Sequence, residues 1–362
     1  MAQKKALIAM SGGVDSSVAA FLTREAGYDC MGATMRLYEG ESQDLQESTC
    51  CSLDDVEDAR SVAYRLGMPF HVFNSKADFE EKVISKFIRC YECGITPNPC
   101  IDCNRYLKFD HLLRRALILG CDYIVTGHYA RILRDPDTGR YLLYKARDLS
   151  KDQSYVLSCL TQHQLAHTLL PLGELSKAEV RAIAEEKGFI NARKKDSQDI
   201  CFVPDGDYVA FMERHTGKTY TPGDFLDLAG NVVGRHKGAV SYTLGQRKGL
   251  GLAMGAPVYV CDKNMERNTV TVGPNEALFA STLVANDWNW FPFPALAEPM
   301  EVTAKARYNQ QPQPATVYPE RDGKARVVFH QPQRALTPGQ TVVLYDGDMV
   351  IGGGTIIQVV KD

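Results

Sequence analysis

The chain has 362 residues, of which 44% are hydrophobic and 23% charged, a composition typical of a globular protein with two or three domains. A formal net charge of −3 excludes a protein that binds nucleic acid over a broadly basic surface, so any RNA contact must come from local patches. No apolar run reaches the ~18 residues of a membrane span, and no signal-peptide core follows Met1. We therefore expect a cytoplasmic chain whose eleven cysteines are thiols, metal ligands or redox groups rather than structural disulfides.

Strands and helices alternate through the first part of the chain. Ser176 and Glu179 form a capping box at the start of the last helix of this part, and Gly188 ends it. The patterns predict strands over residues 6–10, 29–35, 70–74 and 123–126, and helices from 18 and over 53–66, 77–90, 108–119 and 176–187. This alternation predicts an α/β domain with a doubly wound parallel sheet over residues 1–205, with ligands at the carboxyl ends of its strands.

The character of the sequence changes after residue 205. Short alternating runs between Pro and Gly turns predict a small central β-rich domain over residues 206–282. Pro292 and Pro294 are typical of a linker. Several short strands between residues 300 and 360 predict a C-terminal antiparallel β-barrel, which we place at 283–362.

The turn after the first strand, Ser11–Ser17, has the composition of an anion site. Gly12 and Gly13 allow positive φ and a close backbone approach to a ligand, at the positive end of the following helix. The motif lacks the lysine of a Walker A loop. Asp15 would repel phosphate unless it holds Mg²⁺, which bridges carboxylates to phosphate oxygens. The simpler alternative is an ordinary helix N-cap.

Two residues at other strand ends could join this site. Gly127 follows the predicted strand 123–126. Met35 ends the predicted strand 29–35, where it could contact an adenine, although a methionine at this position is also typical of a core.

The sequence suggests three roles for the cysteines, and Cys103 is a candidate for two of them. Cys90 and Cys93 form one C-x-x-C and Cys100 and Cys103 another, which leaves a zinc site open as a minor alternative. Cys103 and Cys201 lie in polar segments, the first in a predicted Pro-rich loop and the second after Lys194 and Lys195, whose charges would lower a thiol pKa. The remaining cysteines that we assign lie in apolar runs and are expected to be buried: Cys30, Cys121, Cys159 and Cys261.

Nine segments in chain order resemble the motifs of one family. They are Ser11–Ser17, Asn98–Pro99, Cys103–Arg105, Thr126–Tyr129, Lys151–Tyr155, Asp196–Phe202, Thr243–Gly251, Arg307–Tyr308 and Thr337–Gln340. Together they span nearly the whole chain and are similar to those of the bacterial tRNA-specific 2-thiouridylases, which are N-type ATP pyrophosphatases with an adenine nucleotide alpha hydrolase-like sheet.

The resemblance implies an ATP-dependent tRNA-uridine 2-sulfurtransferase. The C2 oxygen of the wobble uridine would attack the α-phosphate of ATP, and sulfur from a persulfide on Cys201 would replace that oxygen. Cys103 would be the second nucleophile and would end in a Cys103–Cys201 disulfide. The implied partners are a tRNA with a wobble uridine (Lys, Glu or Gln type) and a persulfide sulfur-donor protein or cysteine desulfurase, and the chain would act as a monomer.

The resemblance also implies binding residues. ATP would be bound by Ala9, Met10, Ser11, Gly12, Gly13, Val14, Asp15, Ser16, Ser17, Met35 and Gly127. The flipped target base would be held by Asn98, Pro99 and Cys100, and the tRNA would be contacted by Lys151, Asp152, Gln153, Arg307 and Tyr308.

This sequence departs from the family pattern after Asn98-Pro99. Many members have an aspartate there, whereas this chain has Cys100 and an aspartate at Asp102. The family's general-base role therefore does not transfer, and Cys100, Cys103 and Cys201 could instead hold a [4Fe–4S] cluster that carries the sulfur. Two other classes remain open from the residues alone: a ligase of the same ATP-pyrophosphatase type acting on a small carboxylate or amide, and a non-catalytic RNA-binding module.

Overall fold

The structure is a computed structural model that describes residues 3–38, 53–194 and 200–361. The Asp196–Asp199 part of the predicted Cys201 motif lies outside these ranges. The chain divides into two compact units: residues 1–84, 99–206 and 348–351 form the first, and residues 85–98, 207–347 and 352–362 form the second.

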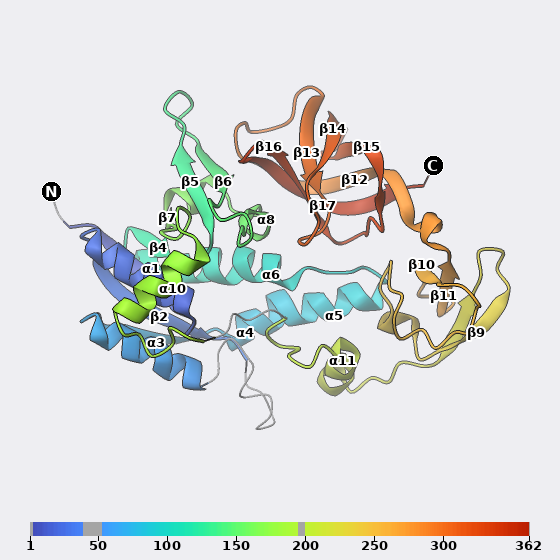
Figure 1. Cartoon of the computed structure of the whole chain (residues 1–362), viewed down its shortest axis with the longest axis horizontal. Helices are drawn as coiled ribbons and strands as arrows, with labels where there is room; N and C mark the ends of the chain where they lie inside the picture. The colour runs from blue at the N-terminus through green and yellow to red at the C-terminus, as the bar shows by residue number, and fades with distance from the viewer. Residues whose placement is uncertain (1–2, 39–52, 195–199, 362) are drawn as a thin grey trace. The chain divides into compact units, whose positions relative to one another are not determined.

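The first unit is built on a parallel sheet, as predicted (Figure 1). Its strands are β1 (Lys5–Ala9), β2 (Asp29–Arg36), β3 (Phe70–Asn74), β4 (Tyr123–Val125) and β7 (Thr168–Leu169), in the order β3-β2-β1-β4-β7. Every pairing in this sheet is parallel. The central strand β1 is apolar because both of its faces are covered, and Ala6, Leu7 and Ile8 are fully buried.

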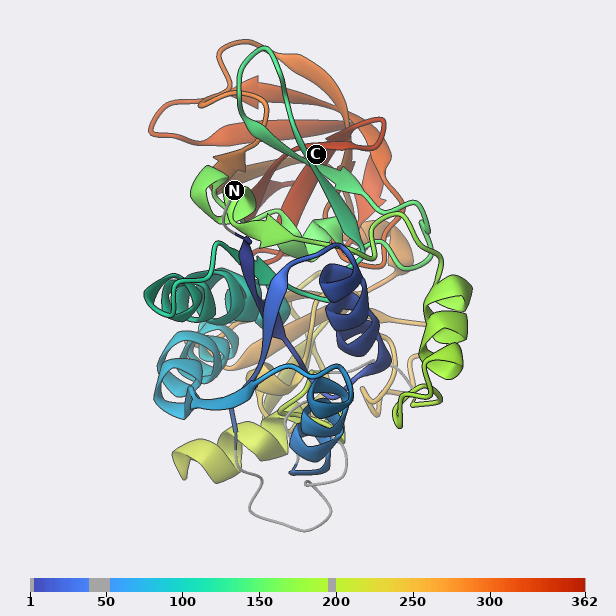
Figure 2. The same cartoon turned by 90° about the vertical axis from the view of Figure 1, so that its left-hand side faces the viewer.

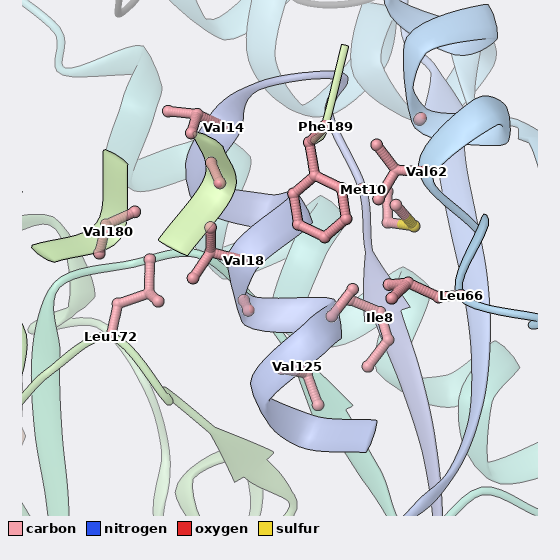
Figure 3. Packing of buried hydrophobic residues seen from close by; sticks show 14 of the residues in the cluster. Ile8, Met10, Val14, Val18, Val62, Leu66, Val125, Leu172, Val180 and Phe189 are labelled. Carbon is pink, nitrogen blue, oxygen red and sulfur yellow. The ribbon is translucent and has the colours of Figure 1, made fainter. Parts of the chain in front are cut away.

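Helices cover both faces of this sheet (Figure 2). One face carries α1 (Val14–Glu25), α3 (Leu53–Arg65) and α10 (Lys177–Glu186). The other carries α4 (Lys76–Phe79), the π-helical turn η1 (Glu80–Ile84), α6 (Pro99–Asp102), the π-helical segment η2 (Cys103–Leu112) and α7 (Leu113–Ile118). On the α1 face, Ile8, Val18, Val62 and Val180 meet in one apolar cluster that fixes α1 over the strands (Figure 3).

Two features of the first unit differ from the sequence prediction. The predicted Pro-rich loop before and around Cys103 is non-helical only over residues 95–98, because Pro99 occupies the first position of α6 and helical turns continue to Ile118. Proline suits that position, since its fixed φ matches a helix and its missing N–H would be unpaired there anyway. A hairpin of β5 (Ala130–Arg134) and β6 (Tyr141–Lys145) was not predicted. The short helices α8 (Ser154–Leu157) and α9 (Gln162–Ala166) follow it.

The second unit contains a small sheet and a barrel. The sheet has the order β10-β11-β8-β9, formed by β8 (Gly223–Leu226), β9 (Val232–His236), β10 (Tyr259–Asn264) and β11 (Thr269–Gly273). Helix α11 (Tyr208–Thr216) and the 3-10 turns η3 (Ala239–Ser241) and η4 (Asn275–Leu278) also belong to this unit.

The predicted C-terminal barrel is confirmed. Its strands are β12 (Phe279–Trp290), β13 (Met300–Lys305), β14 (Gln313–Pro319), β15 (Ala325–Arg334), β16 (Thr341–Asp346) and β17 (Met349–Val360). They follow the order β12-β15-β14-β13-β16-β17, and antiparallel pairing of β12 with β17 closes the barrel. In the parts of the chain that the structure describes, no helix is both long and apolar enough to cross a membrane.

Helix α5 (Ser85–Glu92) comes from the sequence of the predicted first domain but belongs to the second unit. Tyr91 stacks on Tyr208 of α11, with ring centroids 4.3 Å apart. Glu92 Oε1 accepts hydrogen bonds from Lys218 Nζ at 2.6 Å and from the Tyr220 hydroxyl at 3.1 Å. These contacts between distant parts of the sequence attach residues 85–98 to the second unit.

Candidate active site

A tight glycine turn joins β1 to α1. Gly12 has a φ of +76°, and a Cβ at this position would overlap the backbone of Asp55. Gly13 is the N-cap residue of α1. Because it has no side chain to accept the first helical N–H groups, those donors face the loop at the positive end of the helix dipole. This is the geometry of an anion site.

The serine hydroxyls shape this loop from within. Ser16 Oγ and Ser17 Oγ both donate to the carbonyl oxygen of Gly13, at 2.9 and 3.1 Å. The N–H of Ser11 donates to Ser16 Oγ at 3.2 Å. Ser16 and Ser17 are buried, whereas Ser11 is exposed. Ser11 therefore presents the surface hydroxyl of the loop, and the other two act on its backbone.

Asn191 fixes the loop from a distant part of the chain. Its Nδ2 donates to the carbonyl oxygen of Gly12 and to Ser17 Oγ, both at 2.9 Å. Its side chain is buried, with an exposed fraction of 2%. Sequence reasoning missed this residue, because nothing local distinguishes an asparagine in a turn from one that bonds to a loop 179 positions away.

Asp15 is held by a lysine and a tyrosine. Lys177 Nζ lies 2.7 Å from Asp15 Oδ1 and 2.8 Å from Oδ2, and the Tyr129 hydroxyl donates to Oδ1 at 2.7 Å. The Lys177 side chain is only 12% exposed. Both carboxylate oxygens of Asp15 therefore have partners within the protein, and the Mg²⁺ predicted at this residue stays a prediction. Lys177 thereby brings a positive charge to the loop.

The sequence did contain a signal for Lys177. Lys177 is the first residue of α10, directly after its N-cap Ser176. A positive charge at a helix N-terminus opposes the helix dipole. A lysine at this position therefore indicates a partner elsewhere, here Asp15.

Gly127 lies against the loop, and Met35 is buried. A Cβ on Gly127 would be 2.7 Å from the carbonyl carbon of Asp15 and 2.8 Å from the nitrogen of Ser16, so only glycine fits. The structure thus brings Gly127 to the start of α1. Met35 lies near the carboxyl end of β2 with an exposed fraction of 9%.

His128, next to Gly127, is buried, and the segment after β6 forms hydrogen bonds with the backbone on either side of it. Burial, aided by the nearby charge of Lys108, holds the pKa of His128 well below its usual range. Gln153 Oε1 accepts the N–H of Tyr129 at 2.9 Å. Asp152 Oδ1 accepts the N–H of Ala146 at 3.0 Å. Asp152 and Gln153, two of the residues predicted to contact tRNA, thus accept hydrogen bonds from the backbone of neighbouring segments.

The candidate reactive cysteines lie on or near helical segments of the first unit. Cys100 is exposed in α6, and Cys103 is half-buried at the start of η2. Wide π-helical turns often occur at functional sites. Cys201 is half-buried, and its neighbour Phe202 packs edge-on against Phe79 with ring centroids 5.6 Å apart.

The charge predicted to activate Cys201 is engaged elsewhere. Lys194 Nζ lies 2.7 Å from Asp55 Oδ1 and 2.7 Å from Asp58 Oδ2. Burial acts to lower the pKa of Lys194, but these two carboxylates raise it overall. Lys195 lies outside the described residues.

Among the described residues, the cysteines show no metal centre. Across the described residues, no three His, Cys, Asp or Glu side chains gather in an arrangement that could hold a metal ion. This finding gives no support to an iron–sulfur cluster on Cys100, Cys103 and Cys201. Four other cysteines are buried, as predicted, and burial raises their thiol pKa values: Cys30 and Cys159 to about 11, and Cys121 and Cys261 in the same direction.

Arg307 and Tyr308, both predicted to contact tRNA, differ in exposure. Arg307 Nη2 donates to the carbonyl oxygen of Ala335 at 2.7 Å and to Thr337 Oγ1 at 2.6 Å. It also donates to the carbonyl oxygen of Leu244 at 3.2 Å, which links two of the motif segments. Tyr308 is 40% exposed. The Tyr308 ring is therefore accessible at the surface, whereas the Arg307 guanidinium connects the segments around Leu244 and Ala335.

Comparisons with known proteins agree with this architecture. Residues 4–205 match the family model described as a tRNA methyl transferase HUP domain, residues 209–274 a tRNA methyl transferase PRC-barrel domain, and residues 280–356 an aminomethyltransferase β-barrel domain. The chain is thus a HUP-domain protein with two appended β-domains.

Three relatives narrow this class. The tRNA-specific 2-thiouridylase MnmA of Clostridioides difficile (strain 630) is 51% identical over 353 residues, covering 98% of each chain. The proteins of the same name from Acetivibrio thermocellus and Clostridium acetobutylicum are also 51% identical, covering 98% of this chain and 100% and 99% of theirs. The chain belongs to the tRNA-specific 2-thiouridylase (MnmA) family.

Proposed function

We propose that this chain is a tRNA-uridine 2-sulfurtransferase that uses ATP to replace the C2 oxygen of a wobble uridine with sulfur. One observation carries the proposal: an anion-binding loop with Lys177 and Gly127 against it, in a chain that is 51% identical over 98% of its length to a tRNA-specific 2-thiouridylase. A loop that binds phosphates would hold the pyrophosphate that leaves when the uridine oxygen attacks the α-phosphate.

The sulfur step would follow on two thiols of the first unit. The terminal sulfur of a Cys201 persulfide attacks C2 of the adenylated uridine, and AMP leaves with the former C2 oxygen. The Cys103 thiolate then attacks Cys201 Sγ, which breaks the sulfur–sulfur bond, releases 2-thiouridine and forms a Cys103–Cys201 disulfide. A two-electron thiol reductant restores both thiols.

Binding of the tRNA completes the proposal. Asn98, Pro99 and Cys100 would hold the flipped base. Lys151, Asp152, Gln153, Arg307 and Tyr308 would face the tRNA, with the exposed Tyr308 ring available for stacking. Three further points stay predictions. The sulfur donor would be a persulfide donor protein or cysteine desulfurase, the chain would act as a monomer in the cytoplasm, and its domains would end at residues 205 and 282. A role for Mg²⁺, which accompanies ATP in most phosphoryl chemistry, stays a prediction as well. Without a matching set of ligands, no step is assigned to an iron–sulfur cluster.

The persulfide route is tested with single cysteine variants. Purified protein is incubated with ATP, a persulfide donor and tRNA, and 2-thiouridine is measured by mass spectrometry of nucleosides. Cys201→Ser and Cys103→Ser should each abolish the product, since both thiols form bonds in the reaction. The matched control is Cys93→Ser, an exposed thiol outside the scheme, which should keep full activity. Product formation by either active-site variant at the wild-type rate would contradict the route.

A further inference from the structure

The loop Thr337–Gln340 of the barrel unit lies against the residues that precede the proposed base-binding residues. Gln340 Nε2 donates to the carbonyl oxygens of Thr96 and Pro97, at 3.0 and 3.1 Å. The N–H of Thr96 in turn donates to the carbonyl oxygen of Pro338 at 3.2 Å. One amide group thus holds the two peptide units directly before Asn98.

Gly339 makes this approach possible. Its φ is +88°, and a Cβ there would overlap the Ile95 side chain and lie 2.9 Å from the carbonyl oxygen of Thr96. The loop is itself tied to β17, since Gly339 N–H donates to the carbonyl oxygen of Ile356 at 2.8 Å and Ile356 N–H donates to that of Gln340 at 2.9 Å. The barrel strand therefore provides a rigid base for the contact.

The other end of the segment is also fixed by the second unit. Helix α5 is attached through Tyr91 and Glu92, and Gly94, which follows it with a φ of +77°, packs on the side chain of Met265. Pro97 has a φ restricted by its ring and directs the preceding residue toward extended backbone. The chain from residue 85 to 97 is thereby held along its length, up to the residue before Asn98.

We propose that Gln340 is a positioning residue for the target uridine, acting through the backbone of Thr96 and Pro97 on Asn98. The inference rests on the proposed function, because it takes Asn98, Pro99 and Cys100 as the residues that hold the base. On this proposal, the Thr337–Gln340 loop fixes the position of the backbone directly before the base-binding residues. Misplacement of a reacting group by about 1 Å costs on the order of 100-fold in rate, so loss of this contact should appear in the chemical step.

The test compares Gln340→Ala and Gln340→Glu with Gln358→Ala, an exposed glutamine on β17. Glutamate keeps the size of the side chain but removes both N–H donors and places a carboxylate against two carbonyl oxygens. Both Gln340 variants should lower the single-turnover thiolation rate at saturating tRNA by ~10- to 100-fold. The dissociation constants for tRNA and ATP should stay within about twofold of wild type, and Gln358→Ala should match wild type in every assay.

Hydrogen exchange of the peptide containing residues 95–98 gives a readout that does not depend on activity. This peptide should exchange faster in Gln340→Ala than in wild type or Gln358→Ala. Unchanged exchange and an unchanged single-turnover rate would overturn the proposal. Weaker tRNA binding with a normal rate at saturation would also overturn it, because Gln340 would then contact tRNA directly. Absence of 2-thiouridine with the wild-type protein would instead count against the proposed function.

Discussion

The glycine loop Ser11–Ser17, which we propose binds the phosphates of ATP and call the nucleotide loop, and the segment before Asn98 are both held in place by distant residues, but in different ways. The loop takes much of its shape from itself, since Ser16 and Ser17 bond to Gly13 within four positions. The segment 95–97 depends on Gln340, which is 243 positions from Pro97. A local motif therefore defines the first region, and tertiary contacts define the second.

The largest effect is expected at the charge that faces the nucleotide loop. Lys177→Met leaves Asp15 with the Tyr129 hydroxyl alone and places an uncompensated negative charge beside the phosphates. Loss of a charge-assisted hydrogen bond of about 2–3 kcal/mol should weaken ATP binding by ~100-fold. Equilibrium binding of labelled ATP measures the dissociation constant of each variant. The control is Lys187→Met, because Lys187 pairs with the exposed Glu186.

A double variant sharpens this test. In Lys177→Met combined with Asp15→Asn, the repulsion is removed together with the lysine, so part of the lost ATP affinity should return. ATP binding that is unchanged in the single lysine variant would show that Lys177 serves the fold alone.

A smaller effect is expected at Asn191, which connects the loop to a distant turn. Asn191→Ala removes the donor to the carbonyl oxygen of Gly12 and to Ser17 Oγ, leaving buried polar groups without that partner. The free energy of unfolding should fall by about 1–3 kcal/mol, and ATP affinity should fall by roughly 10-fold as the loop loosens. Denaturant titration and ATP binding measure the two effects. Asn309→Ala, at an exposed position, should change neither, and a fully stable Asn191→Ala protein would contradict the assigned role.

The smallest effect concerns His128, beside the nucleotide loop. Its pKa is depressed in the folded protein, so it stays neutral when the unfolded chain takes up a proton below pH ~6.5. Its contribution to stability is therefore complete above that pH and is lost as the pH falls below it, by at most about 1.4 kcal/mol per pH unit. The unfolding free energy of His128→Gln should fall less steeply from pH 6.5 downward than that of wild type, by about one proton.

The same contrast between local motifs and distant contacts separates what could be predicted from the sequence from what could not. The parallel sheet, the glycine loop and the barrel follow from local patterns of apolar residues and turns. Pro97 and Pro99 misled the prediction toward a loop, because proline favours both loops and the first turn of a helix, and only the chain after it decides between them. The partners Lys177–Asp15 and Asn191–Gly12 are 162 and 179 positions apart, and no local pattern encodes such a pairing. The placement of α5 in the second unit was missed for the same reason.

The central claim is that the nucleotide loop serves to activate the uridine oxygen, and an isotope can test it directly. A tRNA carrying oxygen-18 at C2 of the wobble uridine is thiolated by the protein with ATP, and the AMP released is analysed by mass spectrometry. The account predicts one oxygen-18 atom in the phosphate of AMP for each 2-thiouridine formed, because the C2 oxygen leaves attached to the α-phosphorus. Unlabelled AMP accompanying full thiolation would contradict it.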